Sequence, residues 1–262
     1  MTTRALLTVS RSNPQKLLAI ERAQAQRAIT ILLRAALQRS AENDELRERC
    51  ALAEGLAAFP TPGMEPNFTT WLDRQDFFEY GLLALYHLNT PQARAILAQH
   101  VGATSGGLPP PDYQIERWLA VEYLSKMGAQ SYLPIFEKLV DDPVHDVQRS
   151  AVFGIGWLGR GKDLDLLARL ARNGKTMQDR IDALQAIGES GSLEAVPVLI
   201  DLFTLPNADQ PVSSNNFLNE LTHHEILEAS HADLARAQLL WRAWWTQNQQ
   251  TARAYPPINC DY

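Results

Sequence analysis

The sequence predicts an all-α protein, a right-handed solenoid in which pairs of helices stack on one another. Three observations support this prediction. The segment from Gln114 to Leu205 repeats three times with a period of about 31–32 residues, which is typical of stacked repeat arrays. Apolar residues within each copy recur at helical spacing. No segment shows the alternating, β-branched pattern of strands. The chain is therefore expected to work as an extended surface.

The N-terminal region, residues 1–60, is predicted to be helical. Pro14 stands where a first helix can begin, and leucines and isoleucines follow it at helical spacing. A second helix, capped by Asn43, places Leu46, Leu52 and Leu56 on one face. The segment FPTPGMEP (59–66) ends it, because three prolines and a glycine cannot continue a helix.

Residues 68–103 are predicted to be a degenerate copy of the repeat. One helix is expected over about Thr70–Leu88, and Asn89-Thr90-Pro91 separates it from another that runs through about Val101. A loop follows at 103–112, the three regular repeats occupy 114–205, and a second loop is expected at 205–216. Residues 217–250 would then form a helical C-terminal cap.

Each regular repeat contains two helices with one apolar stripe apiece. In VQRSAVFGIGWLG the stripe consists of Ala151, Val152, Ile155 and Leu158, and the next helix presents Leu164, Leu167 and Leu170. Neither helix can bury its stripe alone, so neighbouring repeats must stack to form a continuous core. The repeats align on three glycines: Gly128, Gly159 and Gly191.

The middle repeat resembles a HEAT-type repeat of the short variety first named from phycobilin lyases. Asp142-Pro143 supplies the acidic-proline turn of that pattern, and Pro134 and Pro197 match its proline in the first helix. The arginine that braces neighbouring repeats in this family corresponds to Arg117, Gln148 and Arg180. The middle repeat departs from the pattern, but Arg149 stands beside Gln148. The resemblance covers residues 114–204 and implies the HEAT-like solenoid fold.

The C-terminal segment resembles a cap that ends many bacterial HEAT-repeat proteins, with a W-x-x-W-W-x-x-N finish. Trp241, Trp244 and Trp245 carry the match and lie on one face of the predicted helix. The large aromatic area is suited to covering the last exposed core of a solenoid. A partner-binding aromatic face is the alternative.

Composition and charge limit the classes of function. The net charge is −6 and 45% of the residues are apolar, so the sequence predicts a soluble protein and disfavours a nucleic-acid partner. Residues 1–50 are basic, with nine Lys or Arg against five acids, which favours packing against the acidic remainder or a binding arm. Two distant cysteines, no signal peptide and no long apolar run indicate a cytoplasmic protein without a membrane partner.

Two motifs suggest cofactors but have simpler interpretations. Gly154, Gly156 and Gly159 spell GxGxxG, but these glycines lie at the end of a predicted helix, whereas dinucleotide binding needs a preceding strand. We expect them to allow close packing or a turn. In THHEILEASH (222–231), a helix would place His224, Glu228 and His231 on one face, a spacing that could bind a metal ion. The favoured interpretation of this segment is a polar connector before the cap. His87, His100 and His145 are expected to be ordinary surface or packing residues. No cofactor, metal or catalytic residue is predicted.

The remaining candidate site is a ridge formed by the second helices of successive repeats. Phe153 and Trp157 belong to columns that are expected to lie off the apolar stripe, and exposed aromatics among polar residues are typical of protein-binding hot spots. Packing against a neighbouring repeat is the alternative for both, and the arginines either line the ridge or brace the repeats. The candidate partner-binding residues are Arg117, Glu122, Lys126, Arg149, Phe153, Trp157, Arg180, Gln185 and Glu189.

The sequence therefore predicts a non-enzymatic scaffold or adaptor that binds another protein. The alternative is an enzyme or accessory factor on a HEAT scaffold, similar to a bilin lyase or to a HEAT-like DNA glycosylase.

Overall fold

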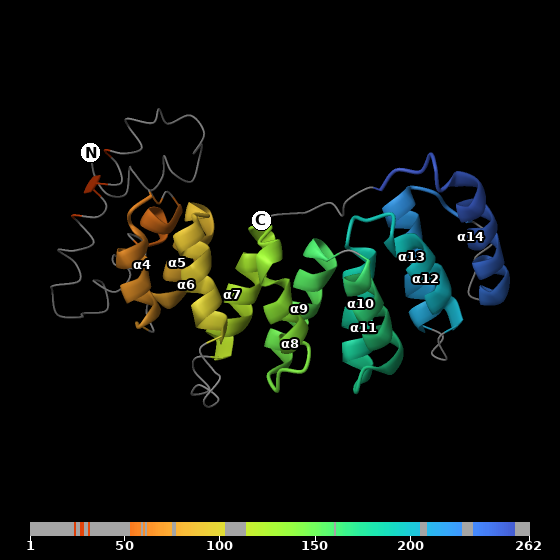
Figure 1. Ribbon diagram of the computed structural model, residues 1–262, viewed down its shortest axis with the longest axis horizontal. Coiled ribbons are helices and arrows are strands. Elements are labelled where there is room, and N and C mark those ends of the chain that lie inside the picture. Colours follow the sequence, from red (N-terminus) through yellow and green to blue (C-terminus); the bar gives the residue numbers. More distant parts are fainter. Residues whose placement is uncertain are drawn as a thin grey trace. The chain divides into compact units, whose positions relative to one another are not determined.

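The described part of the chain is helical throughout and contains no β-strand (Figure 1). The computed structural model describes residues 24, 27–28, 31, 53–58, 60, 62–74, 77–102, 114–159, 161–204, 209–226 and 233–254. Two compact units divide the chain, Met1–Tyr123 and Leu124–Tyr262. The predicted all-α solenoid of helix pairs is confirmed. Of the two helices expected in residues 1–60, only residues 24, 27–28, 31 and 53–58 are described, and all of these are helical. The loop expected at 103–112 lies outside the described residues.

In the first unit, residues 53–58 are helical, and the helices with described bounds follow them. These are α4 (Glu65–Leu72), α5 (Phe78–Leu88), α6 (Pro91–Gly102) and α7 (Gln114–Lys126), of which α7 continues into the second unit. Helices α4, α5 and α6 pack on one another around Phe68, Leu82 and Leu85, which are buried. Asn89 ends α5 in the left-handed conformation, with a φ of 48°.

The single helix expected over Thr70–Leu88 is wrong. The chain leaves the α-helix at Asp73, and α5 begins at Phe78. The break places Phe77 in contact with Trp71, with ring centroids 5.7 Å apart, and both side chains are buried. A continuous helix would place positions 71 and 77 on different faces, so aromatic burial outweighs local helix propensity here.

The second unit contains the regular repeats from Leu124 onward and the C-terminal helices. These are η3 (Gln130–Tyr132), α8 (Leu133–Leu139), α9 (His145–Leu158), α10 (Lys162–Asn173), α11 (Met177–Gly188), α12 (Ala195–Asp201), η4 (Leu202–Thr204), α13 (Asp209–Thr222) and α14 (Leu234–Asn248). The second helices of successive repeats, α9, α11 and α13, contact one another in that order. Helices α10, α12 and α14 also contact one another in that order and form a second layer. The core lies between the layers and contains Phe136, Ile155, Leu167, Ile187 and Leu199.

Local sequence determines where the site-bearing helices begin. Asp142 accepts a hydrogen bond from the Val144 amide at 3.0 Å, which fixes the turn before α9. Thr176 begins α11 with a capping box: its side chain accepts from the Asp179 amide, and the Asp179 carboxylate accepts from the Thr176 amide. Both helices therefore start at fixed residues.

The loop expected at 205–216 is shorter than predicted. Helix α13 begins at Asp209, so Ser213, Ser214 and Asn215 are helical. Pro211 lies in the first turn, where its missing N–H group breaks no helical hydrogen bond. In the part of the chain that the structure describes, no helix is long and apolar enough to cross a membrane.

Candidate functional site

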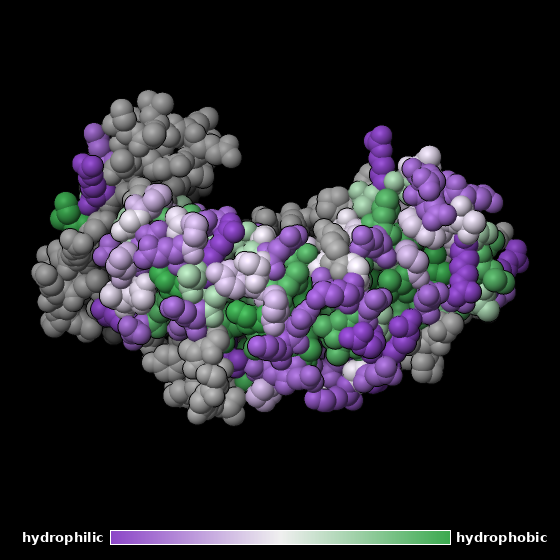
Figure 2. Space-filling model, viewed as in Figure 1, coloured by the Kyte–Doolittle hydropathy of each residue, from purple (hydrophilic) through white to green (hydrophobic). Residues whose placement is uncertain are grey.

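Helices α9 and α11 present equivalent positions of two successive repeats on neighbouring helices. On α9 these positions hold Arg149, Phe153 and Trp157, and on α11 they hold Ile181, Gln185 and Glu189. We call these six residues the α9–α11 ridge. Figure 2 shows one face of the molecule, on which hydrophobic residues of the second unit lie between rows of hydrophilic ones.

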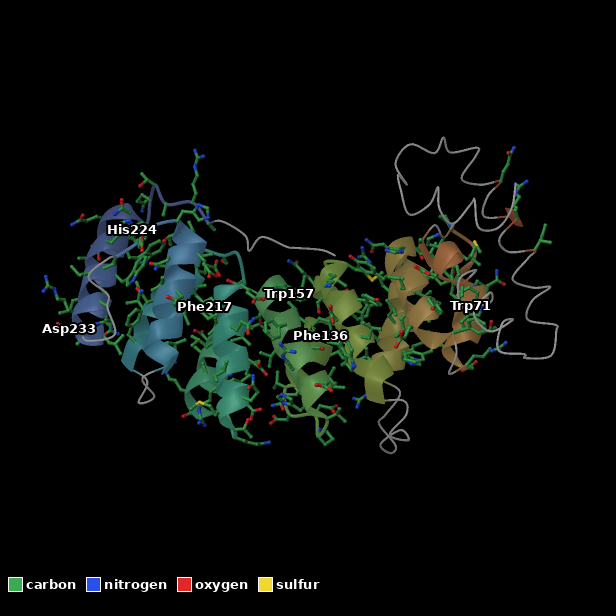
Figure 3. All side chains as sticks on the ribbon, turned by 180° about the vertical axis from the view of Figure 1, so that it is seen from behind. Trp71, Phe136, Trp157, Phe217, His224 and Asp233 are labelled. Atoms are coloured by element: carbon green, nitrogen blue, oxygen red, sulfur yellow. The ribbon has the colours of Figure 1, made fainter. Side chains whose placement is uncertain are left out.

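A cation–aromatic row runs along the α9 side of the ridge. The Arg149 guanidinium carbon lies 5.3 Å from the centroid of the Phe153 ring. The rings of Phe153 and Trp157 follow, with centroids 6.0 Å apart and an angle of 46° between their planes. The residues are spaced by four, so one helix face carries all three. Figure 3 shows Trp157 on α9.

The two aromatic residues of the ridge differ in exposure. Phe153 is only 8% exposed, which agrees with the packing alternative for this residue. The reason is that α9 lies among α8, α10 and α11 and has little free surface. Trp157 is half-buried, the Arg149 side chain is 52% exposed, and Ile181 is 39% exposed. The accessible apolar surface of the ridge therefore comes from Trp157 and Ile181.

Arg149 and Arg180 make bracing contacts, which is one of the two predicted alternatives for the arginines. Arg180 donates a hydrogen bond to the Gly174 carbonyl at 2.7 Å and so ties α11 to the preceding turn. Arg149 Nε lies 3.6 Å from Asp182 Oδ1 in the next repeat. Arg149 thus makes the contact between repeats that Gln148 cannot make. Arg117 is only 4% exposed, so it is not a surface residue.

The remaining predicted residues are spread over both units. Gln185 donates to Glu189 at 2.6 Å on α11, and both are half-buried. Lys126 is exposed at the end of α7 in the second unit. Glu122 is half-buried and, like Arg117, belongs to the first unit. The structure therefore brings together Arg149, Phe153, Trp157, Gln185 and Glu189.

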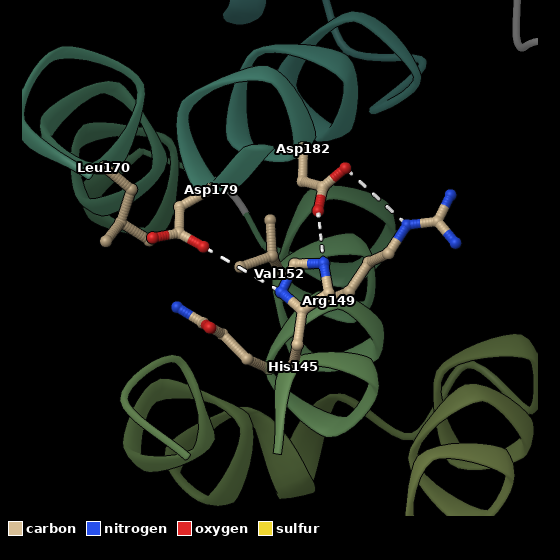
Figure 4. Close-up of a pocket in the computed structure, with 7 residues that line it drawn as sticks. His145, Arg149, Val152, Leu170, Asp179 and Asp182 are labelled. Atoms are coloured by element: carbon tan, nitrogen blue, oxygen red, sulfur yellow. Dashed lines mark ion pairs between the residues drawn. The ribbon is translucent and has the colours of Figure 1, made fainter. Parts of the chain in front are cut away.

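Sequence reasoning missed a small pocket between α9 and α11. Its lining residues are His145, Gln148, Arg149, Val152, Leu170, Asp179 and Asp182. Asp179 and Asp182 point from α11 toward His145 and Arg149 on α9 (Figure 4). His145 lies beside both carboxylates: its Nδ1 is 3.9 Å from Asp179 Oδ1 and its Nε2 is 3.8 Å from Asp182 Oδ2. The available signal was the repeat period, which places Asp182 one repeat and one residue after Arg149.

The glycines of GxGxxG are packing residues, as the repeat alignment predicted. A Cβ atom on Gly156 would collide with the carbonyl oxygen of Ala186 on α11. A Cβ atom on Gly154 would collide with the Ser125 hydroxyl and would lie 3.1 Å from the Phe136 ring. The glycines allow α9 to approach its neighbours closely.

The C-terminal tryptophans form a cluster with His224. The His224 ring stacks on Trp244 with centroids 4.6 Å apart and a 9° angle, and Trp241 meets both rings edge-on. Residues 223–226 are not helical, so the helix required for the alternative metal site is absent there; residues 227–232 lie outside the described part. Among the described residues, no group of three or more His, Cys, Asp or Glu could hold a metal ion.

Comparison with known proteins yields one solved structure to report. No protein-family model matches the chain, and no curated protein matches it. The solved structure is described as the complex of CpcE and CpcF of phycocyanin lyase from Nostoc sp. PCC7120. It is 20% identical, the alignment covers 93% of this chain and 94% of that chain, and the TM-score is 0.43.

This match corrects the prediction that the chain is not an enzyme, because the similar structure is that of a lyase. The similarity is too low to transfer an activity or a catalytic residue to this chain.

Proposed function

We propose that this chain is a helical-repeat subunit of a lyase-type assembly and binds another protein along the α9–α11 ridge. The observation that carries the proposal is the row of Arg149, Phe153 and Trp157 on one face of α9. Arginine and tryptophan are enriched among the residues that dominate protein-binding energy.

The row is already ordered before a partner binds. Asp182 holds the Arg149 guanidinium from one side, and the Phe153 ring lies beneath it. The terminal nitrogens of Arg149 point away from Asp182 (Figure 4). Fixing these side chains in advance reduces the conformational entropy that association costs. Trp157 and Ile181 add apolar area that a partner would remove from water.

The charge of the ridge supports a protein over a nucleic acid. Arg149 is its only cation among the six residues, and Glu189 is its only acid. Two further carboxylates, Asp179 and Asp182, lie beside Arg149. Nucleic-acid surfaces need several cations that each contact a phosphate. The glycosylase-like alternative therefore has no support in this part of the chain.

The lyase-type role has two sources of support. The regular repeats resemble the short HEAT-like repeats of phycobilin lyases, and the similar solved structure is a phycocyanin lyase built from two different proteins. In this proposal the chain works with a second protein subunit and with a chromophore-bearing protein, in the cytoplasm.

Site-specific photo-cross-linking tests the ridge directly. A photoreactive residue replaces Gln185 on α11 or, as the control, exposed Arg169 on α10 in the opposite layer. We expect a cross-linked partner only from position 185, and we expect Trp157→Ala to reduce its yield about tenfold, as for a hot-spot tryptophan. Equal cross-linking from both positions would contradict the ridge.

Binding to apo-phycocyanin tests the lyase-type role separately. The full chain is mixed with apo-phycocyanin and free bilin, and the absorption of covalently bound bilin is measured after denaturation. Faster attachment than in the absence of the chain supports the role. If the chain neither binds apo-phycocyanin nor changes attachment, the lyase-type role fails while the ridge remains testable by cross-linking.

A further inference from the structure

The pocket between α9 and α11 contains a buried carboxylate oxygen that has no hydrogen-bond donor. The Asp182 side chain is 3% exposed, and its Oδ1 accepts from Gln178 at 2.8 Å. Its Oδ2 is buried and accepts no hydrogen bond. A buried carboxylate oxygen without a donor is costly, because it has given up its hydration without replacement. The described residues therefore leave one acceptor unfilled in this pocket.

Two further acceptors face the same space. Asp179 Oδ2 is occupied by the Thr176 amide, whereas its Oδ1 faces His145 Nδ1 at 3.9 Å. The distance of 3.8 Å between His145 Nε2 and Asp182 Oδ2 is also too long for a hydrogen bond. When the imidazole is neutral, one of its nitrogens is an acceptor as well. Three acceptors match the three N–H donors of a primary ammonium group.

The charge and size of the pocket favour the same group. Two carboxylates and one guanidinium leave one excess negative charge when His145 is neutral. The pocket has room for about one water molecule, which is the size of an ammonium head and smaller than a guanidinium. Val152 and Leu170 form apolar walls against which a methylene stem can lie.

We propose that this pocket binds the side-chain ammonium group of a lysine on the protein partner. The inference rests on the proposed α9–α11 ridge, because Arg149 belongs both to the ridge and to the pocket lining. The pocket therefore lies beside the end of the ridge that Arg149 forms. The lysine would place its ammonium group between His145 and the two aspartates, while neighbouring partner residues cover Trp157.

A small probe tests the pocket without a partner. The probe is n-butylammonium chloride, a mimic of the lysine side chain, added to the full-length protein at about pH 8, where the ammonium group of the probe is charged. The NMR signals of the His145 ring, assigned with a His145→Gln variant, report binding. We expect a saturable shift that sodium chloride at equal ionic strength and n-butanol do not produce.

Two controls separate binding from general charge effects. Asp182→Asn keeps the shape of the side chain but removes its charge, and it should weaken n-butylammonium binding about tenfold, as expected when a hydrogen bond to a charged group is lost. On the wild-type protein, n-butyltrimethylammonium has the charge but no N–H donor and is too large, so it should not bind. The latter comparison holds even if the variant folds poorly.

The outcomes distinguish this inference from the proposed function. No saturable shift, or equal binding of both ammonium probes, would overturn the lysine pocket and show that His145 and the aspartates are only a clamp between repeats. Trp157→Ala should leave n-butylammonium binding unchanged. If the probe binds but cross-linking at position 185 fails, the ridge is wrong and the ammonium site stands alone.

Discussion

Tyr123 shows how a single residue responds to its surroundings in the first unit. Its ring stacks on Tyr86, with centroids 4.8 Å apart and 15° between the planes. Burial raises the pKa of Tyr123 to about 12, and the charges of Glu122 and Glu79 act in the same direction. A phenolate at this position would lose hydration and face two carboxylates.

The pKa of Tyr123 predicts how stability changes at alkaline pH. Tyrosine in the unfolded chain loses its proton near pH 10, whereas folded Tyr123 keeps it to about pH 12. The unfolded state therefore binds fewer protons in this window, and the free energy of unfolding falls as pH rises through it. We expect Tyr123→Phe to lose less stability than the wild type between about pH 9 and about pH 11, measured by urea unfolding. Equal losses would contradict the assignment.

The pKa of the buried Glu65 carboxyl group is shifted downward, in the opposite direction to that of Tyr123. Burial raises its pKa, but hydrogen bonds from its own backbone amide, the Thr90 hydroxyl and the Gly63 amide outweigh this, and the net pKa is lowered. Its contribution to stability is therefore present above the ordinary pKa of 4.5 and is lost as pH falls through the lowered value.

At the scale of elements, two glycines allow the second helices of successive repeats to approach each other closely. Gly156 of α9 lies directly against the backbone of Ala186 on α11, and a Cβ atom at position 156 would lie 2.9 Å from the Ala186 carbonyl carbon. Gly188 of α11 lies against the Phe217 ring of α13. The two glycines differ in what a side chain would have to displace.

Alanine substitutions at either glycine should destabilise the protein. Gly156→Ala should lower the free energy of unfolding by roughly 1–3 kcal/mol, because the Ala186 carbonyl is fixed within its helix. Gly188→Ala should also lower the free energy of unfolding by roughly 1–3 kcal/mol, because the new Cβ would lie 2.7 Å from Phe217 Cβ, which moves only with the backbone of α13. Both values come from urea unfolding followed by circular dichroism. A variant at either position that is as stable as the wild type would contradict the close approach of these helices.

The turn glycines agree with the repeat alignment in two repeats and differ from it in the middle repeat. Gly128 and Gly191 adopt positive φ angles of 67° and 62°, as a turn glycine in an aligned column should. In the middle repeat this conformation belongs to Gly161, with a φ of 51°, whereas Gly159 has a φ of −74° and ends α9. The middle turn is therefore displaced by two residues. The sequence contains both glycines, and only the backbone conformation distinguishes them.

At the scale of the molecule, the C-terminal helix α14 lies against the last repeat of the second unit. Trp241 is fully buried and donates from Nε1 to Asn215 Oδ1 of α13 at 2.7 Å. Gln238 donates to the Ile200 carbonyl on α12 at 2.7 Å, and Arg242 donates to Asp201 at 2.9 Å. These contacts attach α14 to both layers. That α14 caps the array remains a prediction.

Two tryptophan substitutions test the cap. Trp241→Ala should cost about 3–5 kcal/mol and leave Asn215 without its donor. The half-buried Trp245 is the matched control, and Trp245→Ala should cost less. If α14 is a cap, the first variant should also increase binding of a hydrophobic dye, because the apolar face of the last repeat becomes exposed. Equal stability and equal dye binding of the two variants would argue against the capping role.

The sequence alone determined the all-α class, the helix-pair repeat and the packing role of the glycines in GxGxxG. These features follow from periodicity, and stacked repeats bury whatever stripe the period creates. Only the tertiary structure decided that Phe153 is buried, that α4 and α5 are separate, and that His145 meets Asp179 and Asp182. Burial and the pairing of side chains between repeats depend on how closely neighbouring helices approach each other. The spacing of residues along one helix does not specify that distance.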